Sequence, residues 1–277
     1  MKNGLKDNAS FAGGGDKGEE VLWALILGGS SGLGLATAKK LASHRFNLLI
    51  VHRDRRADLD EIEKHFKEIT TTGVQLKTFN ADATNNEKRN ALIQEIQSLL
   101  GDSNKIKVLI HSIAKGSLKP MQSAANVELS HQDFQITLDA MALSLYDWTK
   151  ALVAAQLFAA DARIVSFTSE GNTKAWNNYG AVSVAKAALE SLTRNMALEF
   201  APLGIKANCI QAGLTDTKSF QMIPGNQALK ENALRRNPFN RLTRPEDVAN
   251  VAYLLTTKEA QWINGTVIKV DGGESLQ

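Results

Sequence analysis

Cysteine is almost absent from this sequence, since Cys209 is the single one among 277 residues. One cysteine excludes a disulfide within the chain and any cysteine-rich metal site. It also suits the reducing conditions of the cytoplasm, which is the location we expect. The five histidines, among them His44, His52 and His111, show no spacing typical of metal ligands, so we expect no metal site.

Charge of one sign and long hydrophobic runs are lacking as well. The 32 basic and 29 acidic residues leave a net charge of +3, and the basic residues are scattered along the chain. A nucleic-acid-binding protein more often concentrates them on one element. No apolar run approaches the roughly 18–20 residues that cross a bilayer. We therefore expect no nucleic-acid partner and no membrane partner.

Proline is scarce, with five residues against 20 glycines, while 43% of residues are hydrophobic and 22% are charged. This globular composition excludes a fully disordered, collagen-like or coiled-coil chain. The length fits one large α/β domain. We expect residues 1–19 to form a flexible tail and residues 20–277 to form a single domain. The apolar run 21–27 follows two glutamates instead of a basic segment, so it predicts a buried strand and not a signal peptide.

Short apolar runs alternate with helix-period segments after the tail. The strand-like runs are 21–27, 47–52, 74–80, 106–112, 162–169, 205–211 and 266–270. The helical segments lie near 33–44, 57–71, 86–100, 130–160, 179–200, 226–236 and 245–257. The pattern predicts an α/β fold, a doubly wound seven-stranded parallel sheet of the Rossmann type covered on both faces. Its ligand is expected beyond the carboxyl ends of the strands.

A glycine cluster stands at the first strand-to-helix turn, and it includes Gly28, Gly32 and Gly34. Glycines here let the backbone turn tightly and approach a diphosphate, which then faces the N–H groups and the positive dipole end of the helix. A tight turn alone would explain glycines. Their position after a buried strand and before a helix favours dinucleotide binding.

The residue type at the end of the second strand determines which nicotinamide cofactor is preferred. An acidic side chain there binds the ribose 2′-hydroxyl of NAD, whereas an arginine accepts the 2′-phosphate of NADP. Arg53 lies 19 residues after Gly34, and Arg55 and Arg56 follow it. Arginines bind phosphate with two parallel hydrogen bonds, so NADPH is the expected cofactor. NADH is the less favoured alternative, since Asp54 could turn inward and the run could be a solvated loop.

Tyr179 and Lys186 are seven residues apart in a segment that the pattern predicts to be helical. Seven residues make nearly two turns, so both side chains can face one cleft about 10 Å apart along the axis. A tyrosine can donate a proton to an oxygen that gains charge, and a nearby lysine lowers the phenol pKa and can hold the nicotinamide ribose. Alone, the pair could be a core-edge tyrosine and a solvated lysine. The glycine turn on the same sheet favours catalysis.

Over roughly residues 20–275 the chain resembles the short-chain dehydrogenase/reductase family. The resemblance rests on the glycine turn, on Tyr179 and Lys186, and on three short segments at 81–83, 212–213 and 270–273. Most carbonyl reductases of the family carry Tyr-x3-Lys, whereas Val182 stands in that tyrosine position here. The Tyr-x6-Lys spacing and the segment 111–114 resemble the enoyl-acyl-carrier-protein reductases. Residues 113–121 are similar to their NADPH-dependent branch, the one most like ordinary family members.

The longer spacing suits the chemistry of that branch. In ketone reduction the acid stands beside the carbon that takes the hydride. In reduction of an enoyl thioester the hydride goes to Cβ, and charge develops on an enolate oxygen two carbons further along. Moving the tyrosine back by about one turn shifts its attachment by roughly 5 Å, towards a more distant oxygen.

Ser169 marks a departure from many enoyl reductases, which carry a second tyrosine ten residues before the first. The branch most like ordinary family members also has serine there, so the departure favours that branch. Two interpretations of Ser169 stay open. It either hydrogen-bonds a thioester oxygen or caps the end of its strand.

The resemblance also implies a complete site, with Tyr179, Lys186 and Ser169 as catalytic residues. Asp82 is implied to bond the adenine amino group, and Thr217 the pyrophosphate. The implied cofactor contacts are Gly28, Ser30, Ser31, Gly32, Leu33, Gly34, Arg53, Asp82, Ala83, Ser112, Ile113, Ala114, Lys186, Ala212, Gly213, Thr215 and Thr217. Residues 214–240 are expected to form a mobile lid over the acyl chain, with Phe220, Met222 and Ile223 along an apolar channel. The family habit implies a homotetramer, with 151–160 and 179–200 as candidate contact faces.

The leading hypothesis is NADPH-dependent reduction of the 2,3 double bond of trans-2-enoyl thioesters, in the last step of fatty-acid elongation. The thioester would be carried by acyl carrier protein or by coenzyme A. The alternative is a ketone or alcohol oxidoreductase such as a 3-oxoacyl thioester reductase. A nucleotide-sensing protein without turnover is disfavoured, because such relatives tend to lose the tyrosine or the lysine.

Overall fold

A single parallel sheet organises the molecule, as the computed structural model shows for residues 21–124 and 127–277. Within these ranges seven strands lie in the order β3-β2-β1-β4-β5-β6-β7, and every pairing is parallel. The strands are β1 (Trp23–Leu27), β2 (Asn47–His52), β3 (Leu76–Asn80), β4 (Ile106–His111), β5 (Phe158–Ser169), β6 (Ile205–Ala212) and β7 (Val267–Val270). The predicted doubly wound fold is confirmed. The expected tail at 1–19 lies outside the described residues.

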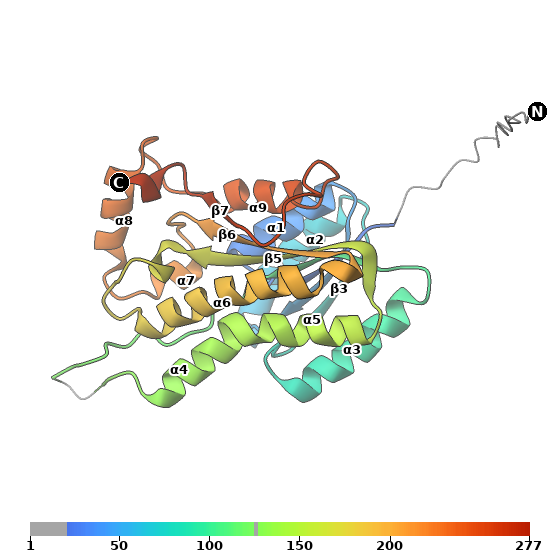
Figure 1. Cartoon of the computed structure of the whole chain (residues 1–277), viewed down its shortest axis with the longest axis horizontal. Helices are drawn as coiled ribbons and strands as arrows, with labels where there is room; N and C mark the ends of the chain where they lie inside the picture. The colour runs from blue at the N-terminus through green and yellow to red at the C-terminus, as the bar shows by residue number, and fades with distance from the viewer. Residues whose placement is uncertain (1–20, 125–126) are drawn as a thin grey trace, which may run out of the picture.

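Helices cover both faces of the sheet (Figure 1). They are α1 (Gly32–Ser43), α2 (Leu59–Thr70), α3 (Asn86–Leu100), α4 (His131–Leu138), α5 (Ser144–Ala154), α6 (Gly180–Glu199), α7 (Lys218–Gln221), α8 (Asn226–Arg236) and α9 (Pro245–Leu254). Among the described residues, none of these helices combines the length and the apolar character that crossing a membrane requires.

Strand β1 shows why the sheet sits in the centre. All five of its residues are buried. Because side chains alternate along a strand, Ala24 and Ile26 pack with α1, α2 and α9, while Leu25 and Leu27 pack with α3, α5 and α6. Each large apolar side chain removed from water in this way contributes about 1.5–3 kcal/mol before conformational entropy is considered. Two cores, one on each face, therefore fix the sheet.

The predicted helix at 130–160 is wrong at its end and irregular in its middle. A π-helical turn, η2 (Asp139–Leu143), joins α4 to α5, and α5 ends at Ala154. Gln156 then takes a left-handed conformation with φ 53°, which turns the chain out of the helix. Residue Phe158 already pairs with Ile106 of β4. Pairing with the sheet thus overrides the helix propensity of this alanine-rich stretch.

Candidate active site

A cleft of about 490 Å³ opens at the carboxyl ends of the strands. The turns after β1 to β6 line it, together with residues of α7, α8 and the segment that follows β7. All of the predicted site residues line this cleft except Gly34, which packs behind the glycine turn. The structure therefore brings the predicted residues together, while the role of each one stays a prediction.

The glycine turn leaves no room for side chains at two positions. Gly28 has a φ of 85°, and a Cβ on it would collide with the carbonyl oxygen of Ser112 at the end of β4. A Cβ on Gly34 would collide with the carbonyl oxygen of Gly28. Ser31 precedes α1 and its side chain caps no backbone N–H group. The first N–H groups of α1 are thus available at the cleft, where an anion is favoured.

The turn after β6 is equally tight. Gly213 follows Ala212, and a Cβ on Gly213 would lie 2.8 Å from Cα of Asp271. Thr215 donates to the carbonyl oxygen of Gly213 at 2.9 Å. Thr217 accepts a hydrogen bond from the Phe220 N–H at 3.2 Å and so begins α7. Thr217 lies beside the glycine turn, because a Cβ on Gly32 would be 3.5 Å from Cγ2 of Thr217.

Arg53, Lys115 and Asp82 form a charged group at the end of the cleft beside β2 and β3. Arg53 Nη1 donates to Asp82 Oδ2 at 2.5 Å, and Lys115 Nζ lies 3.6 Å from the same oxygen. Burial opposes ionisation of Asp82. Hydrogen bonds from Thr84 and Arg53 and the charge of Lys115 outweigh it, and they hold the pKa of Asp82 well below its usual range.

Asp54 is held by its neighbours. Its carboxylate lies 2.8 Å from Nδ1 of His52, and its N–H donates to the side-chain carbonyl of Asn80. Of the three neighbouring arginines, Arg53 lines the cleft, whereas Arg55 is exposed outside it. Arg53 is therefore the one of these three arginines that lines the cleft.

Tyr179 stands before α6 and not within it. Asn178 has a φ of 63°, and Tyr179 is the residue from which the helix departs at Gly180. The phenol lies 3.2 Å from the hydroxyl of Ser169, which ends β5. Gly171 leaves space for the ring, because a Cβ there would lie 2.5 Å from Cε1 of Tyr179.

Burial raises the pKa of the Tyr179 phenol, and the hydrogen bond with Ser169 offsets part of this. The predicted lowering of this pKa by Lys186 is not found. Lys186 donates instead to the carbonyl oxygen of Phe167 at 2.6 Å. Burial also lowers the pKa of the Lys186 ammonium, although Cys209 and Glu190 oppose this. The phenol consequently stays protonated over a wide pH range.

The other side of the cleft is apolar. Leu118, Met141, Trp176 and Val182 line it beside Tyr179, and the Trp176 and Tyr179 ring centroids are 5.0 Å apart. Phe220 and Ile223 line the cleft from the predicted lid, as expected. Met222 does not line it and is 74% exposed. The predicted lid folds into α7 and α8, and its mobility stays a prediction.

Several lining residues were missed by sequence reasoning. They include Trp176, Glu170 and Glu274, while Gly171, behind the lining, leaves space for the Tyr179 ring. Glu170 follows a residue that the sequence singled out, which was the one available signal. The contacts of Glu170 join segments far apart in the chain, and no local pattern shows them.

Several known proteins are similar to this chain over most of its length. A family model described as "Enoyl-(Acyl carrier protein) reductase" matches residues 28–275. The 1-cyclohexenylcarbonyl-CoA reductase of Streptomyces collinus is 29% identical over 255 residues, which cover 91% of this chain and 86% of that protein. A tropinone reductase homologue of Arabidopsis thaliana is 25% identical over 257 residues, covering 93% and 92% of the two chains.

Solved structures agree with the fold. The enoyl-[acyl-carrier-protein] reductase (NADH) of Aquifex aeolicus superposes with a TM-score of 0.80 at 27% identity, covering 93% of this chain and 98% of that one. YwfH, an NADPH-dependent reductase involved in bacilysin biosynthesis, gives 0.78 at 27% identity, covering 92% and 98%. Similar proteins thus include users of either nicotinamide cofactor.

His111 makes the stability of the site dependent on pH. Its Nε2 lies 2.8 Å from the Ser144 hydroxyl, and burial, with Lys186 as the second cause, lowers the pKa of His111 to about 3. A group whose pKa is lower in the folded state contributes stability above its unfolded pKa of about 6.5 and loses it as the pH falls.

We expect His111→Gln to flatten the fall in the free energy of unfolding below pH 6.5. The change in slope is at most about 1.4 kcal/mol per pH unit, measured by urea denaturation. Parallel curves for the two proteins would contradict this.

Proposed function

The chain belongs to the short-chain dehydrogenase/reductase family, and we propose that it uses NADPH to reduce the 2,3 double bond of trans-2-enoyl thioesters. The observation that carries this is the position of Tyr179 before α6. Val182, four residues before Lys186, presents an apolar side chain to the cleft instead of a phenol. The acid therefore lies further along the cleft than a Tyr-x3-Lys pattern would put it.

The cofactor site fits a dinucleotide on structural grounds. The positions at Gly28 and Gly34 are closed to any Cβ, and the uncapped start of α1 offers N–H groups to a pyrophosphate. Ser112, Ile113, Ala114 and the hydroxyl of Thr215 would complete its walls. When bound, the nicotinamide supplies a hydride for the substrate Cβ.

The chain's own residues then act on the thioester end. The Tyr179 phenol, whose raised pKa keeps its proton, would donate a hydrogen bond to the thioester oxygen and stabilise the enolate as charge develops. It would then relay the proton that Cα gains as the saturated thioester forms, and regain one from water. Ser169 orients that phenol from 3.2 Å. Lys186 would hold the nicotinamide ribose. Met141, Leu118 and the aromatic ring of Trp176 exclude water and contact the acyl chain.

The Streptomyces relative supports a conjugated thioester as substrate. Its name describes a coenzyme A thioester whose carbonyl is joined to the double-bonded carbon of a cyclohexene ring. That is an α,β-unsaturated thioester, the same chemical class as a trans-2-enoyl thioester. The family description, an enoyl-(acyl carrier protein) reductase, names the same class. Acyl carrier protein as the carrier, fatty-acid elongation as the pathway and the cytoplasm as the location stay predictions.

A 3-oxoacyl thioester reductase is the second candidate. The 3.2 Å contact between Ser169 and Tyr179 favours it, because a serine and a tyrosine together can bind one carbonyl oxygen. In that case hydride would go to the carbon that bears the oxygen.

Replacing Tyr179 with phenylalanine removes the hydroxyl and keeps the ring. We expect the turnover number on crotonyl-coenzyme A to fall by about 10²-fold or more, because a positioned acid contributes that much. NADPH binding, followed by its fluorescence, should stay near the wild-type value. Tyr253→Phe, outside the cleft, is the matched control. Unchanged turnover in Tyr179→Phe would contradict the assignment.

The same assay separates the two candidate reactions. The wild-type chain is compared on a 2-enoyl and a 3-oxoacyl thioester, on coenzyme A and on acyl carrier protein. Faster oxidation of NADPH with the 3-oxoacyl thioester would favour the second candidate instead.

NADPH is proposed because positive charge lies where its 2′-phosphate would sit. The side chain of Arg53 is 58% exposed at the cleft, and Lys115 lies nearby. Both side chains form an ion pair with Asp82. The rival acid, Asp54, is paired with His52. A phosphate arriving between Arg53 and Lys115 would gain charge-assisted hydrogen bonds.

Replacing Arg53 with aspartate should reverse this preference. We expect the ratio of kcat/KM for NADPH over NADH to fall by about tenfold or more, since a bidentate phosphate contact is lost and a like charge is added. Arg55→Asp makes the same charge change outside the cleft and should leave the ratio near wild type. An unaltered ratio in Arg53→Asp would contradict the assignment of Arg53 as the group that binds the 2′-phosphate.

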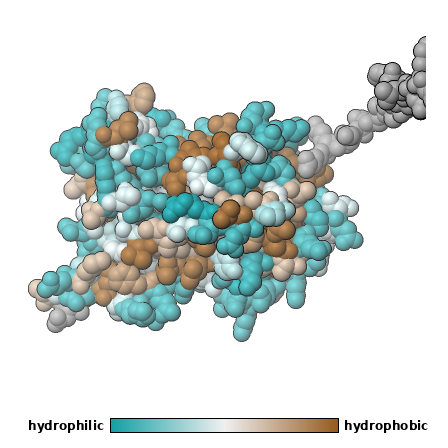
Figure 2. All heavy atoms as spheres, viewed as in Figure 1, coloured by the Kyte–Doolittle hydropathy of each residue, from teal (hydrophilic) through white to brown (hydrophobic). Residues whose placement is uncertain are grey.

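We also propose that copies of the chain associate through α6 and α5 into the expected homotetramer. Val184 and Leu198 on α6 are 48% and 76% exposed, and Tyr146 of α5 is 38% exposed. Figure 2 shows hydrophobic residues on this face of the molecule, over α6 and α5. Burying them between copies would remove apolar surface from water.

Sedimentation velocity should show a tetramer. The double variant Val184→Glu with Leu198→Glu should lower the fraction of tetramer, while Leu276→Glu should not. A wild-type monomer at micromolar concentration would refute the association.

A further inference from the structure

One buried carboxylate holds both ends of segment 214–236, which carries α7 and α8. Glu274 Oε2 accepts a hydrogen bond from the backbone N–H of Leu214 at 3.0 Å. Glu274 Oε1 lies 2.9 Å from Nη2 of Arg236. Leu214 begins the segment and Arg236 ends it, and Glu274 is only 4% exposed. The two oxygens of one side chain therefore bring the first and last residues of the segment together.

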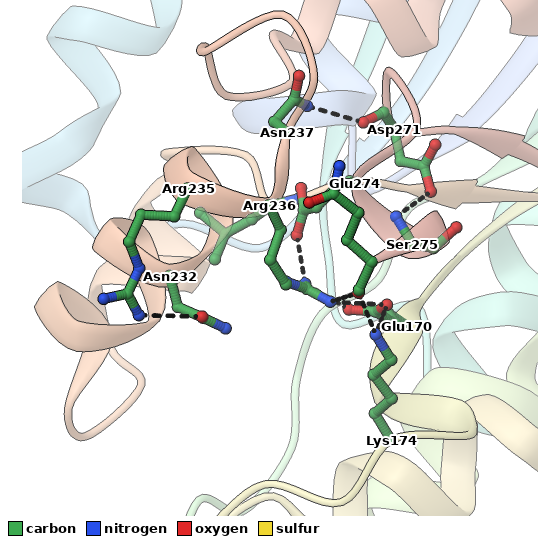
Figure 3. Close-up of polar contacts among 12 residues, drawn as sticks. Glu170, Lys174, Asn232, Arg235, Arg236, Asn237, Asp271, Glu274 and Ser275 are labelled. Atoms are coloured by element: carbon green, nitrogen blue, oxygen red, sulfur yellow. Dashed lines mark hydrogen bonds and ion pairs between the residues drawn. The ribbon is translucent and has the colours of Figure 1, made fainter.

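Arg236 also ties this point to the end of β5. Its Nη1 and Nη2 donate to the two carboxylate oxygens of Glu170 at 3.1 and 2.7 Å. Glu170 directly follows Ser169, whose hydroxyl lies 3.2 Å from the Tyr179 phenol. Figure 3 shows Arg236 between Glu170 and Glu274, with Lys174 approaching Glu170 from the opposite side. Three segments of the chain thus meet at one guanidinium.

Burial makes this arrangement specific. Glu170 is 7% exposed, and the side chain of Arg236 is 18% exposed. Charged groups withdrawn from water this far need partners with good geometry, and a planar guanidinium meets that need with two parallel hydrogen bonds. The next residue, Asn237, is anchored as well, because its side-chain N–H donates to the carbonyl oxygen of Asp271 at 2.9 Å.

The segment held in this way forms part of the substrate side of the cleft. Phe220 of α7, Ile223 in the connection between the two helices, and Leu229 of α8 all line the cleft. Ile223 packs against the apolar cluster that contains Tyr179 and Trp176, where the acyl chain would lie. A shift of either end of the segment would move this wall relative to the phenol.

We propose that Arg236 and Glu274 are positioning residues that clamp segment 214–236 to the end of β5 and so set the apolar wall against Tyr179. They act through the segment and touch no reacting atom. The clamp itself stands on the contacts given above. Its effect on the thioester substrate rests on the proposed function.

Arg235 provides a matched control for the test. It precedes Arg236 in α8, carries the same charge and is exposed. It donates to the side chain of Asn232 at 3.2 Å and points away from Glu170 and Glu274 (Figure 3). Arg236→Gln and Arg235→Gln therefore make the same chemical change at neighbouring positions, and only the first removes the clamp.

Hydrogen–deuterium exchange on the full chain reads the clamp without any activity. We expect the amides of 214–236 to exchange about tenfold faster or more in Arg236→Gln, because local opening becomes easier, while β1 and β4 stay protected. Arg235→Gln should match the wild type throughout. With whichever thioester the wild type reduces, KM should rise about tenfold in Arg236→Gln, with a smaller change in kcat and in NADPH binding.

Two outcomes would overturn the proposal. One is exchange over 214–236 that is the same in Arg236→Gln and Arg235→Gln, and the other is faster exchange spread evenly over the chain. If Arg236→Gln does not fold, Arg236→Lys, which keeps the charge without the bidentate contact, is tested by the same criteria. If no thioester is reduced by the wild type, the proposed function fails, and the exchange comparison still decides the clamp.

Discussion

The close packing of the turn after β1 against the end of β4 is the constraint on which the cleft depends. No Cβ fits at Gly28 or at Gly34, because backbone oxygens already occupy that space. Ser112 N–H donates to the carbonyl oxygen of Leu27 at 2.8 Å and continues the pairing of β1 with β4 up to the turn. As a result α1 starts close to the edge of the sheet. Its N–H groups and the turn 112–114 form one continuous wall.

The end of β5 links this wall to the rest of the site. Each of its last three residues contacts a different side chain. The Phe167 carbonyl accepts from Lys186, the Thr168 hydroxyl donates to Glu190, and Ser169 contacts the Tyr179 phenol. Glu170, the next residue, binds Arg236. A displacement of this strand end would therefore disturb Lys186, the Tyr179 phenol and Arg236 together, so one stretch of backbone positions all three.

The fold and the gathering of the glycine turn and Arg53 at one cleft were predictable because their causes are local in sequence. Fully apolar runs identify strands buried on both faces, and the predicted bounds of α3 and α8 match the structure. Glycines after the first strand and Arg53 after the second stand at fixed distances along the chain. The helix predicted at 130–160 failed because periodicity does not reveal that Phe158 pairs with Ile106. Strand pairing there is a tertiary effect.

The apolar side of the cleft was less predictable for the same physical reason. Arg236 and Glu170 are 66 residues apart in sequence, and neither has a spacing that identifies it as a partner of the other. Met222 and Ile223 are neighbours of similar character, yet one is exposed and the other lines the cleft. Side-chain direction in a short segment follows from how its ends are held, and a single carboxylate holds both ends here. The residues of the glycine turn are therefore fixed by the sheet, whereas the residues on the apolar side of the cleft are fixed by contacts made across the chain.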